Sequence, residues 1–216
     1  MSILTTLKEA THSRHVALEA CSPLLDQQLS ISEYKLLLKK FFSYYAPLER
    51  RLVALPPARL GAFRYSDRQK TRLLVQDLVA LNETLASVAE FDPWPVLPTL
   101  SSSGQVWGCL YVIEGATLGG KIISSHLRNN LGLGVTSGAA FFHGYGSQTG
   151  ALWKTFCASL TDHVAQIDDV DQIVLGALQT FDTLGNCLNA SPIALPVQTR
   201  KSFQTNADHY RHFLQP

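Results

Sequence analysis

The sequence lacks the patterns that mark several large classes of protein. Its four cysteines, Cys21, Cys109, Cys157 and Cys187, are scattered without a Cys-x-x-Cys pair, which predicts free thiols in a reducing compartment. The formal net charge is +1, and no basic stripe is interleaved with aromatic residues, so nucleic acid is not an expected partner. The first residues lack the basic-then-apolar layout of a signal peptide, and we therefore expect a cytoplasmic protein.

Long hydrophobic runs and strand-like alternation are missing as well. The most apolar stretch, around residues 106–123, is interrupted by Glu114 and a glycine cluster, short of the roughly 20 apolar residues of a membrane span. No glycine loop of the phosphate-, flavin- or nicotinamide-binding kind follows a predicted strand. Helical spacing dominates instead. The 216 residues, 46% of them hydrophobic, predict one all-α domain over residues 1–216 that does not contact a membrane.

Start and stop signals divide the chain into predicted helices. Ser30 and Glu33 form a capping box that opens the second helix, and Gly132 ends a long helix in the middle of the chain. The count of helices exceeds that of a four-helix bundle, so we expect a larger multihelical bundle. The predicted helices lie near residues 2–21, 30–55, 66–88, 103–131, 148–167, 169–189 and 198–214.

Three glycines in six residues interrupt the helix expected over residues 103–131. They are Gly115, Gly119 and Gly120, and each costs about 0.5–1 kcal/mol relative to alanine inside a helix. Such a cost predicts that something lies unusually close to the backbone, or that the helix bends. Close helix packing and the approach of a ligand both satisfy this requirement, and the glycines alone do not separate them.

His15 is the candidate metal ligand, on the apolar stripe of the first helix. Glu19 follows at i+4, so its carboxylate can accept from one ring nitrogen and leave the other facing a metal. Lys8 stands nearly two turns earlier on the same face, about 10 Å along the axis, where it can meet the acid group of a flat ligand. Tyr111 can donate its hydroxyl to a similar group. The alternatives are a core histidine, an exposed lysine, and His12 as the ligand in place of His15.

Two motifs together resemble one family. The N-terminal motif of the haem oxygenases is similar to Leu7-Lys8-Glu9-Ala10-Thr11 followed by His15 and Glu19. The glycine-rich distal helix of the bacterial, biliverdin-producing members resembles Glu114-Gly115-Ala116-Thr117-Leu118-Gly119-Gly120. The resemblance implies a single-domain helical bundle with haem b held between the first helix and a kinked, glycine-rich distal helix.

The same resemblance implies residue roles around the haem. His15 would be the iron ligand with Glu19 as its partner, Lys8 and Tyr111 would hold the propionates, and Phe181 would pack on the haem edge. Simple core packing is the alternative for Phe181.

On the distal side, Gly115, Gly119 and Gly120 would be the catalytic positions, because they let the helix bend and lie almost on the haem face. Ala116 stands where mammalian members carry an aspartate, so backbone groups would organise the distal water. No basic residue occurs in residues 169–189, which leaves Lys121 or Arg128 as further propionate partners.

The activity implied by the resemblance is the opening of haem, as both substrate and cofactor, to biliverdin, ferrous iron and carbon monoxide. It requires O2 and electrons from a separate ferredoxin or flavoprotein reductase. A bilin acceptor such as a bacteriophytochrome is one destination for the product, and iron acquisition is another purpose. A non-catalytic haem carrier and a haem-free, thiaminase-like enzyme are the alternative functions. His209 and His212, at i and i+3, fit a polar helix face better than a metal pair.

Overall fold

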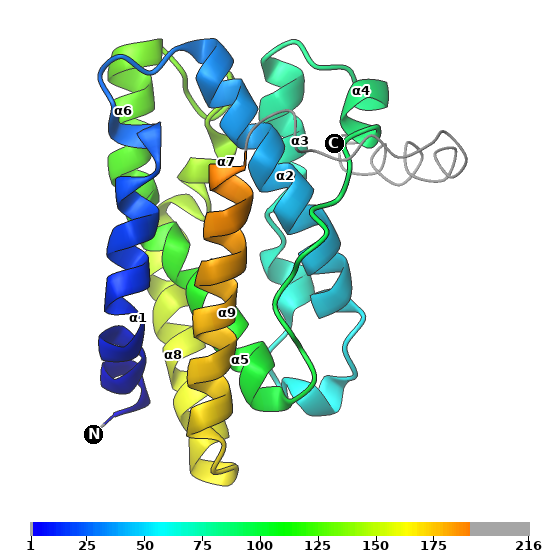
Figure 1. Cartoon of the computed structure of the whole chain (residues 1–216), viewed down its shortest axis with the longest axis vertical. Coiled ribbons are helices and arrows are strands. Elements are labelled where there is room, and N and C mark those ends of the chain that lie inside the picture. Colours follow the sequence, from blue (N-terminus) through cyan, green and yellow to red (C-terminus); the bar gives the residue numbers. More distant parts are fainter. Residues whose placement is uncertain (1, 191–216) are drawn as a thin grey trace.

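The computed structural model describes residues 2–190 and is a single helical domain, with no strand in that range. The helix predicted near residues 198–214, with His209 and His212, lies outside the described residues. Figure 1 shows the order of the elements. The α-helices are α1 (Ile3–Ala20), α2 (Ile31–Val53), α3 (Thr71–Ala80), α4 (Leu85–Ala89), α5 (Ser103–Gly115), α6 (Gly120–Leu131), α7 (Ala140–His143), α8 (Thr149–Gln166) and α9 (Val170–Asn189). The 3-10 turns are η1 (Pro23–Leu25), η2 (Pro57–Arg59), η3 (Tyr65–Arg68), η4 (Ala116–Gly119) and η5 (Gly146–Gln148).

The predicted capping box at the start of α2 is confirmed. The Glu33 backbone N–H donates to the Ser30 hydroxyl at 3.2 Å, and the Ser30 N–H donates to the Glu33 carboxylate at 2.9 Å. These bonds satisfy donors that the first turn of a helix leaves without intrahelical partners. The C-terminal end of α6 is also where the sequence predicted it, because Gly132 adopts the left-handed conformation with φ 69°.

The single helix predicted over residues 66–88 is wrong. The chain there forms η3, α3 and α4, with a break after α3. Asn82 has φ 68°, a left-handed conformation that ends the helix, and Thr84 then caps α4 by accepting from the Ser87 N–H. Residues 132–147, which lie between two predicted helices, also hold a short helix, α7, that apolar spacing did not reveal.

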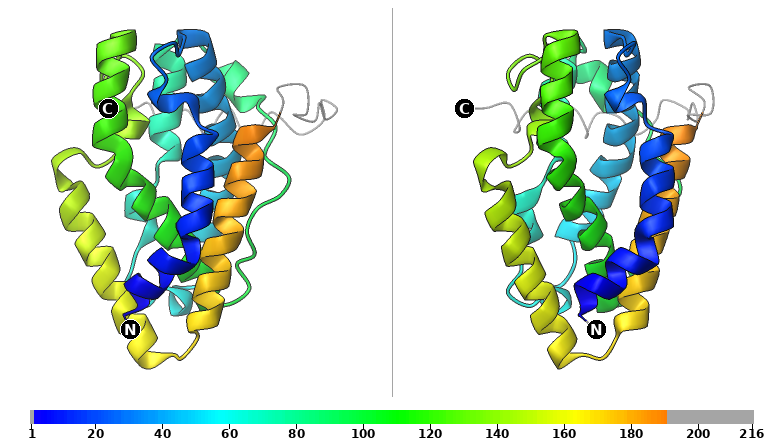
Figure 2. Two further views of the ribbon diagram at one scale, coloured as in Figure 1. Left: turned by 60° about the vertical axis from the view of Figure 1, so that its left-hand side comes forward. Right: turned by 90° about the vertical axis from the view of Figure 1, so that its left-hand side faces the viewer.

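Helix α5 is the centre of the fold and packs along α9 with very little space between the backbones. A Cβ added at Gly108 would collide with the carbonyl of Ile173, and one added at Gly176 would collide with that of Gln105. By length and composition alone, residues 103–131 could cross a membrane, but half of the most apolar window is buried inside the domain. Its first part, α5, is a buried core helix that packs along α9, and α1 packs on α9 as well (Figure 2).

A buried carboxylate holds α7 in place. Asp77 on α3 has no exposed surface, and its two oxygens accept from the backbone N–H groups of Ala140 at 2.7 Å and Phe141 at 2.8 Å. Burial raises the pKa of Asp77 to about 7, against the opposing effect of these two hydrogen bonds. Since α7 contributes Phe141 and Phe142 to the core, Asp77 fixes how these rings are presented.

Replacing Asp77 tests this anchor. We expect Asp77→Asn to lower the free energy of unfolding by about 1–3 kcal/mol, because its amide NH2 cannot accept from one of the two backbone donors. In the wild-type protein, the raised native pKa of Asp77 means that the folded state favours the protonated carboxyl. The contribution of this group to stability is therefore smallest at a pH where it must ionise. Its contribution therefore falls as pH rises from about 4 to about 7. Urea unfolding across this pH range should show that slope, and the slope should become smaller in Asp77→Asn. An unchanged stability and slope would contradict the assignment.

Candidate functional site

A cavity of about 410 Å³ opens between α1 and the segment that joins α5 to α6. Its size falls in the range of about 300–1,000 Å³ that is usual for small-molecule sites. Helices α2, α7 and α9 complete its walls, which are mainly apolar. The apolar lining includes Leu18, Leu24, Phe41, Ile113, Phe142 and Leu184.

His15 lines this cavity from α1, and its side chain remains 56% exposed. Its Nδ1 lies 3.6 Å from the Glu19 carboxylate, which also lines the cavity. The carboxylate therefore lies next to one ring nitrogen, and Nε2 is available to a metal. The Phe181 ring meets the imidazole edge-on, with ring centroids 5.8 Å apart. Phe181 thus contacts His15 but does not line the cavity.

The other residues that the sequence predicted to contact a ligand do not line the cavity. Lys8 is exposed on α1, and Lys121 and Arg128 are exposed on α6. Tyr111 packs against Trp153 with ring centroids 5.9 Å apart, and burial raises its pKa while a hydrogen bond with Thr11 opposes that shift. His12, the rival ligand, is exposed. It does not line the cavity, whereas His15 does.

The distal wall is a break in the long helix. The α-helical bonding of α5 ends at Gly115, the turn η4 follows as a 3-10 segment, and α6 begins at Gly120. Figure 2 shows the resulting change in direction between α5 and α6. This is the bend that the glycine run predicted. Residues 115–117, 119 and 120 all line the cavity, so backbone forms much of this wall.

The three glycines have different surroundings. A Cβ added at Gly119 would meet nothing within 4 Å, whereas one added at Gly120 would collide with the carbonyl of Phe142. At Gly115 it would make ordinary contact with Trp153, at 3.6 Å. Helix packing therefore explains Gly120, while Gly119 leaves open space in the cavity. The packing alternative thus applies to Gly120, while the approach of a ligand remains the prediction for Gly119.

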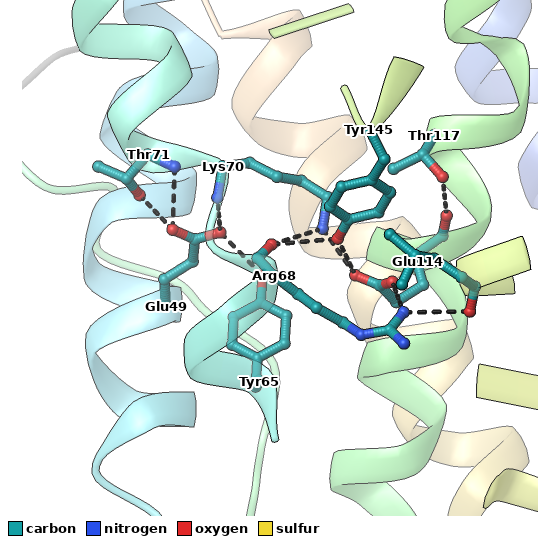
Figure 3. A network of polar contacts seen from close by, with 9 residues as sticks. Glu49, Tyr65, Arg68, Lys70, Thr71, Glu114, Thr117 and Tyr145 are labelled. Atoms are coloured by element: carbon teal, nitrogen blue, oxygen red, sulfur yellow. Dashed lines mark hydrogen bonds and ion pairs between the residues drawn. The ribbon is translucent and has the colours of Figure 1, made fainter. Parts of the chain in front are cut away.

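A buried charged cluster lies directly behind the distal wall (Figure 3). The Glu114 carboxylate is 1% exposed and accepts from Arg68 and Lys70, each at 2.7 Å, and from the Tyr145 hydroxyl at 2.9 Å. Lys70 also lines the cavity, where it is the only lysine or arginine among the lining residues. The cluster places fixed charge next to an otherwise apolar distal wall.

Two further polar groups at the cavity have no protein partner within residues 2–190. Tyr45 is 1% exposed and lines the cavity, and its hydroxyl makes no hydrogen bond there. The hydroxyl of Ser22, also in the lining, is buried without a partner. Buried polar groups normally have partners, so the Ser22 hydroxyl favours a ligand or water at the site, and Tyr45 lines the same cavity. Apolar walls, an accessible imidazole and a backbone-lined face fit a flat, metal-bearing ligand such as haem.

Comparison with known proteins decides the family. The family model described as Heme oxygenase matches residues 1–190. This chain belongs to the haem oxygenase family. A curated haem oxygenase from Xanthomonas campestris pv. campestris (strain 8004) is 32% identical over 111 residues, which cover 51% of this chain. The match spans 66% of that relative's own length.

Solved haem oxygenase structures share the fold. The enzyme from Leptospira interrogans superposes with a TM-score of 0.65 at 17% sequence identity, covering 87% of this chain and 98% of that chain. The NO- and CO-bound haem oxygenase from Neisseria meningitidis gives a TM-score of 0.64 at 18% identity, covering 93% of this chain and 100% of that chain. At these identities the likeness establishes the architecture expected of the family, a single-domain helical bundle.

Sequence reasoning missed several residues that line or support this cavity. Tyr45 and Lys70 looked like ordinary positions within two predicted helices, and the aromatic residues of α7 lay between predicted helices. One signal was present, since Glu114 is a carboxylate inside the most apolar stretch of the chain. A buried charge of that kind requires partners, and the nearby basic pair Arg68 and Lys70 could have been considered for that role.

Alanine substitutions at adjacent glycines separate the packing role from the open space. Gly119→Ala should be neutral or raise the free energy of unfolding by up to about 1 kcal/mol, because φ is −73° and no atom is near. Gly120→Ala should lower it by about 1–3 kcal/mol or more, because the Phe142 carbonyl must shift. Chemical unfolding of the two variants checks both values. Equal effects at the two positions would refute the distinction.

Proposed function

We propose that this chain is a haem oxygenase that opens haem to biliverdin, with release of ferrous iron and carbon monoxide. The observation that carries the proposal is the pairing of His15 with a distal wall of backbone across one cavity. Family membership supports the same function. Haem bound here supplies the iron at which O2 is activated, and a separate ferredoxin or flavoprotein reductase supplies the electrons.

On the proximal side, His15 would bind the iron through Nε2. Glu19 beside Nδ1 favours the tautomer with the proton on Nδ1, and the edge of Phe181 limits rotation of the ring. A neutral imidazole donates less electron density than a thiolate, so it gives less push toward O–O bond cleavage. This ligand type suits a reaction in which the porphyrin ring itself is the site of attack.

On the distal side, the lining residues are small and offer few polar groups to a ligand. Gly119 leaves room at the turn, and Ala116 presents a methyl group to the cavity. The Thr117 hydroxyl donates to the Glu114 carbonyl at 2.6 Å, so it can only accept a further hydrogen bond. The hydroxyl of Tyr45 is available to hold water or a polar ligand group. Water held there and by backbone groups would supply protons to the reaction.

The propionates would extend toward the mouth of the cavity. Lys8 remains our proposed partner for one of them, with Tyr111, Lys121 and Arg128 as further candidates that require side-chain movement on binding. We also propose a cytoplasmic location, consistent with the scattered thiols. Supply of the product to a bilin-binding photoreceptor and iron acquisition are both compatible with this chemistry.

The decisive experiment adds haem, a ferredoxin–reductase couple and O2 to the full chain. A haem oxygenase should bleach the Soret band while a bilin band grows. An unchanged haem spectrum would instead identify a haem carrier, and no Soret band on adding haem would identify a haem-free enzyme of the same scaffold. Chromatography of the product then gives the ring position that is opened.

Removing the imidazole tests the axial ligand. His15→Ala should lose the spectrum of histidine-ligated ferric haem and should weaken haem binding, because no other histidine lines the cavity within the described chain. The matched control is His12→Ala, one turn away and exposed, which should retain the wild-type spectrum. A normal spectrum for His15→Ala together with a changed one for His12→Ala would assign the ligand to His12.

Filling the space at the distal turn tests the backbone wall. Gly119→Leu should lower the turnover rate at least about tenfold, since its side chain would occupy the open space where the distal ligand must fit. The fold should persist, because a Cβ added at Gly119 would have no atom within 4 Å and would enter open space. Turnover and circular dichroism of this variant should be compared with those of Gly119→Ala. Normal turnover in Gly119→Leu would refute the close-approach argument.

A further inference from the structure

Glu114 is a carboxylate at a position where the fold offers almost no contact with water. It ends the apolar part of α5, one residue before the glycine that begins the distal bend, and only 1% of it is exposed. A buried charge without partners would cost several kcal/mol, so its surroundings must compensate for it. The role proposed for it below rests on the proposed function.

The compensating groups come from outside the distal helix. Arg68 in η3 donates to one carboxylate oxygen and Lys70, just before α3, donates to the other, each at 2.7 Å. The Tyr145 hydroxyl, from the loop between α7 and η5, reaches the Lys70-bound oxygen at 2.9 Å. Figure 3 shows these groups converging on Glu114 from different parts of the chain. The carboxylate is thus held from several directions, which restricts translation and rotation of the helix end.

The cluster is balanced in charge, and its second carboxylate makes different contacts. Glu49 on α2 is 1% exposed and accepts from the Tyr65 hydroxyl at 2.8 Å and from the Lys70 backbone N–H at 2.7 Å. It also accepts from the backbone and side chain of Thr71, at 3.0 and 2.6 Å. None of these contacts involves the distal helix. Glu114 is therefore the link between this buried cluster and the distal wall.

The distal turn itself has few other attachments. Gly119 has no neighbour that a side chain would touch, and the Thr117 hydroxyl donates back to the Glu114 carbonyl rather than to another element. At the far end, the close contact of Gly120 with the Phe142 carbonyl holds the start of α6. The segment between these points is a 3-10 turn, whose hydrogen bonds are weaker in geometry than those of an α-helix.

We infer that Glu114 is a positioning residue for haem opening. Its carboxylate, fixed by Arg68 and Lys70, sets where the α-helical bonding of α5 stops and how far the turn η4 projects into the cavity. The residue does not touch the ligand. It acts through the backbone of residues 115–119, where Ala116 offers no carboxylate of its own.

Hydrogen exchange of the haem-free full chain tests this inference without relying on turnover. In Glu114→Gln, the amides of residues 116–120 should exchange at least about tenfold faster than in the wild-type chain, because the neutral amide cannot satisfy both cations. The matched control is Glu49→Gln, which removes an equally buried carboxylate from the same cluster. It should lower the melting temperature too, yet leave exchange in residues 116–120 within about twofold of wild type.

A milder variant keeps the test valid if Glu114→Gln fails to fold. Tyr145→Phe removes one neutral donor from Glu114 without changing the charge balance, and it should accelerate exchange in residues 116–120 to a smaller extent. In the haem-loaded chain, Glu114→Gln or Tyr145→Phe should also change the ratio of biliverdin isomers, whereas Glu49→Gln should not.

Two exchange results would overturn the inference. One is unchanged exchange of residues 116–120 in Glu114→Gln and Tyr145→Phe, and the other is an equal increase in Glu49→Gln, which would mark general loosening. If the wild-type chain fails to degrade haem, the proposed function fails, while the exchange comparison still decides whether Glu114 holds the turn.

Discussion

The ion pairs of Glu114 with Arg68 and Lys70 are the interaction on which the cavity depends most directly. They join the end of α5 to the segment before α3, and Tyr145 adds the loop after α7 to the same point. Removing the carboxylate or its cationic partners would leave the opposite charge buried without a partner. Such a loss is far more costly than losing a surface ion pair. Segments that are distant in sequence therefore meet at one fixed place beside the ligand cavity.

Close backbone contact is the second constraint, and it acts on both sides of the bend. Gly108 and Gly176 let α5 lie against α9, and Gly120 lets α6 lie against α7. These contacts hold the two halves of the long helix separately, so the turn between them can remain open toward the cavity. Asp77 completes the support by holding the first turn of α7 from behind.

Much of the fold follows from local sequence patterns, and the misses have physical causes. The capping box at Ser30 and the left-handed glycine at Gly132 fixed helix ends because each acts within a few residues. The break after α3 depends on Asn82 adopting a positive φ, which its sequence neighbours do not require. The short helix α7 exists because Asp77, some 60 residues earlier, accepts from its first N–H groups.

The candidate site was predictable to the extent that it rests on spacing along one helix. His15 and Glu19 share a face at i and i+4, and both line the cavity. The partners of Glu114 could not be deduced in that way, because they come from separate elements whose approach depends on the whole fold. Likewise, sequence alone did not separate Gly119 from Gly120, since the difference lies in what stands opposite each Cα.

A wall built from backbone has a consequence for how such a site can change. Side chains that face a ligand can be exchanged one by one, and each exchange alters the contact directly. At η4 the surface offered to the ligand is largely peptide, which is the same for every amino acid. A side chain added at the turn itself, as at Gly119, only fills the space, so finer variation in ligand geometry on this side arises from residues behind the turn. Engineering of the distal face would therefore begin with positions that never meet the ligand.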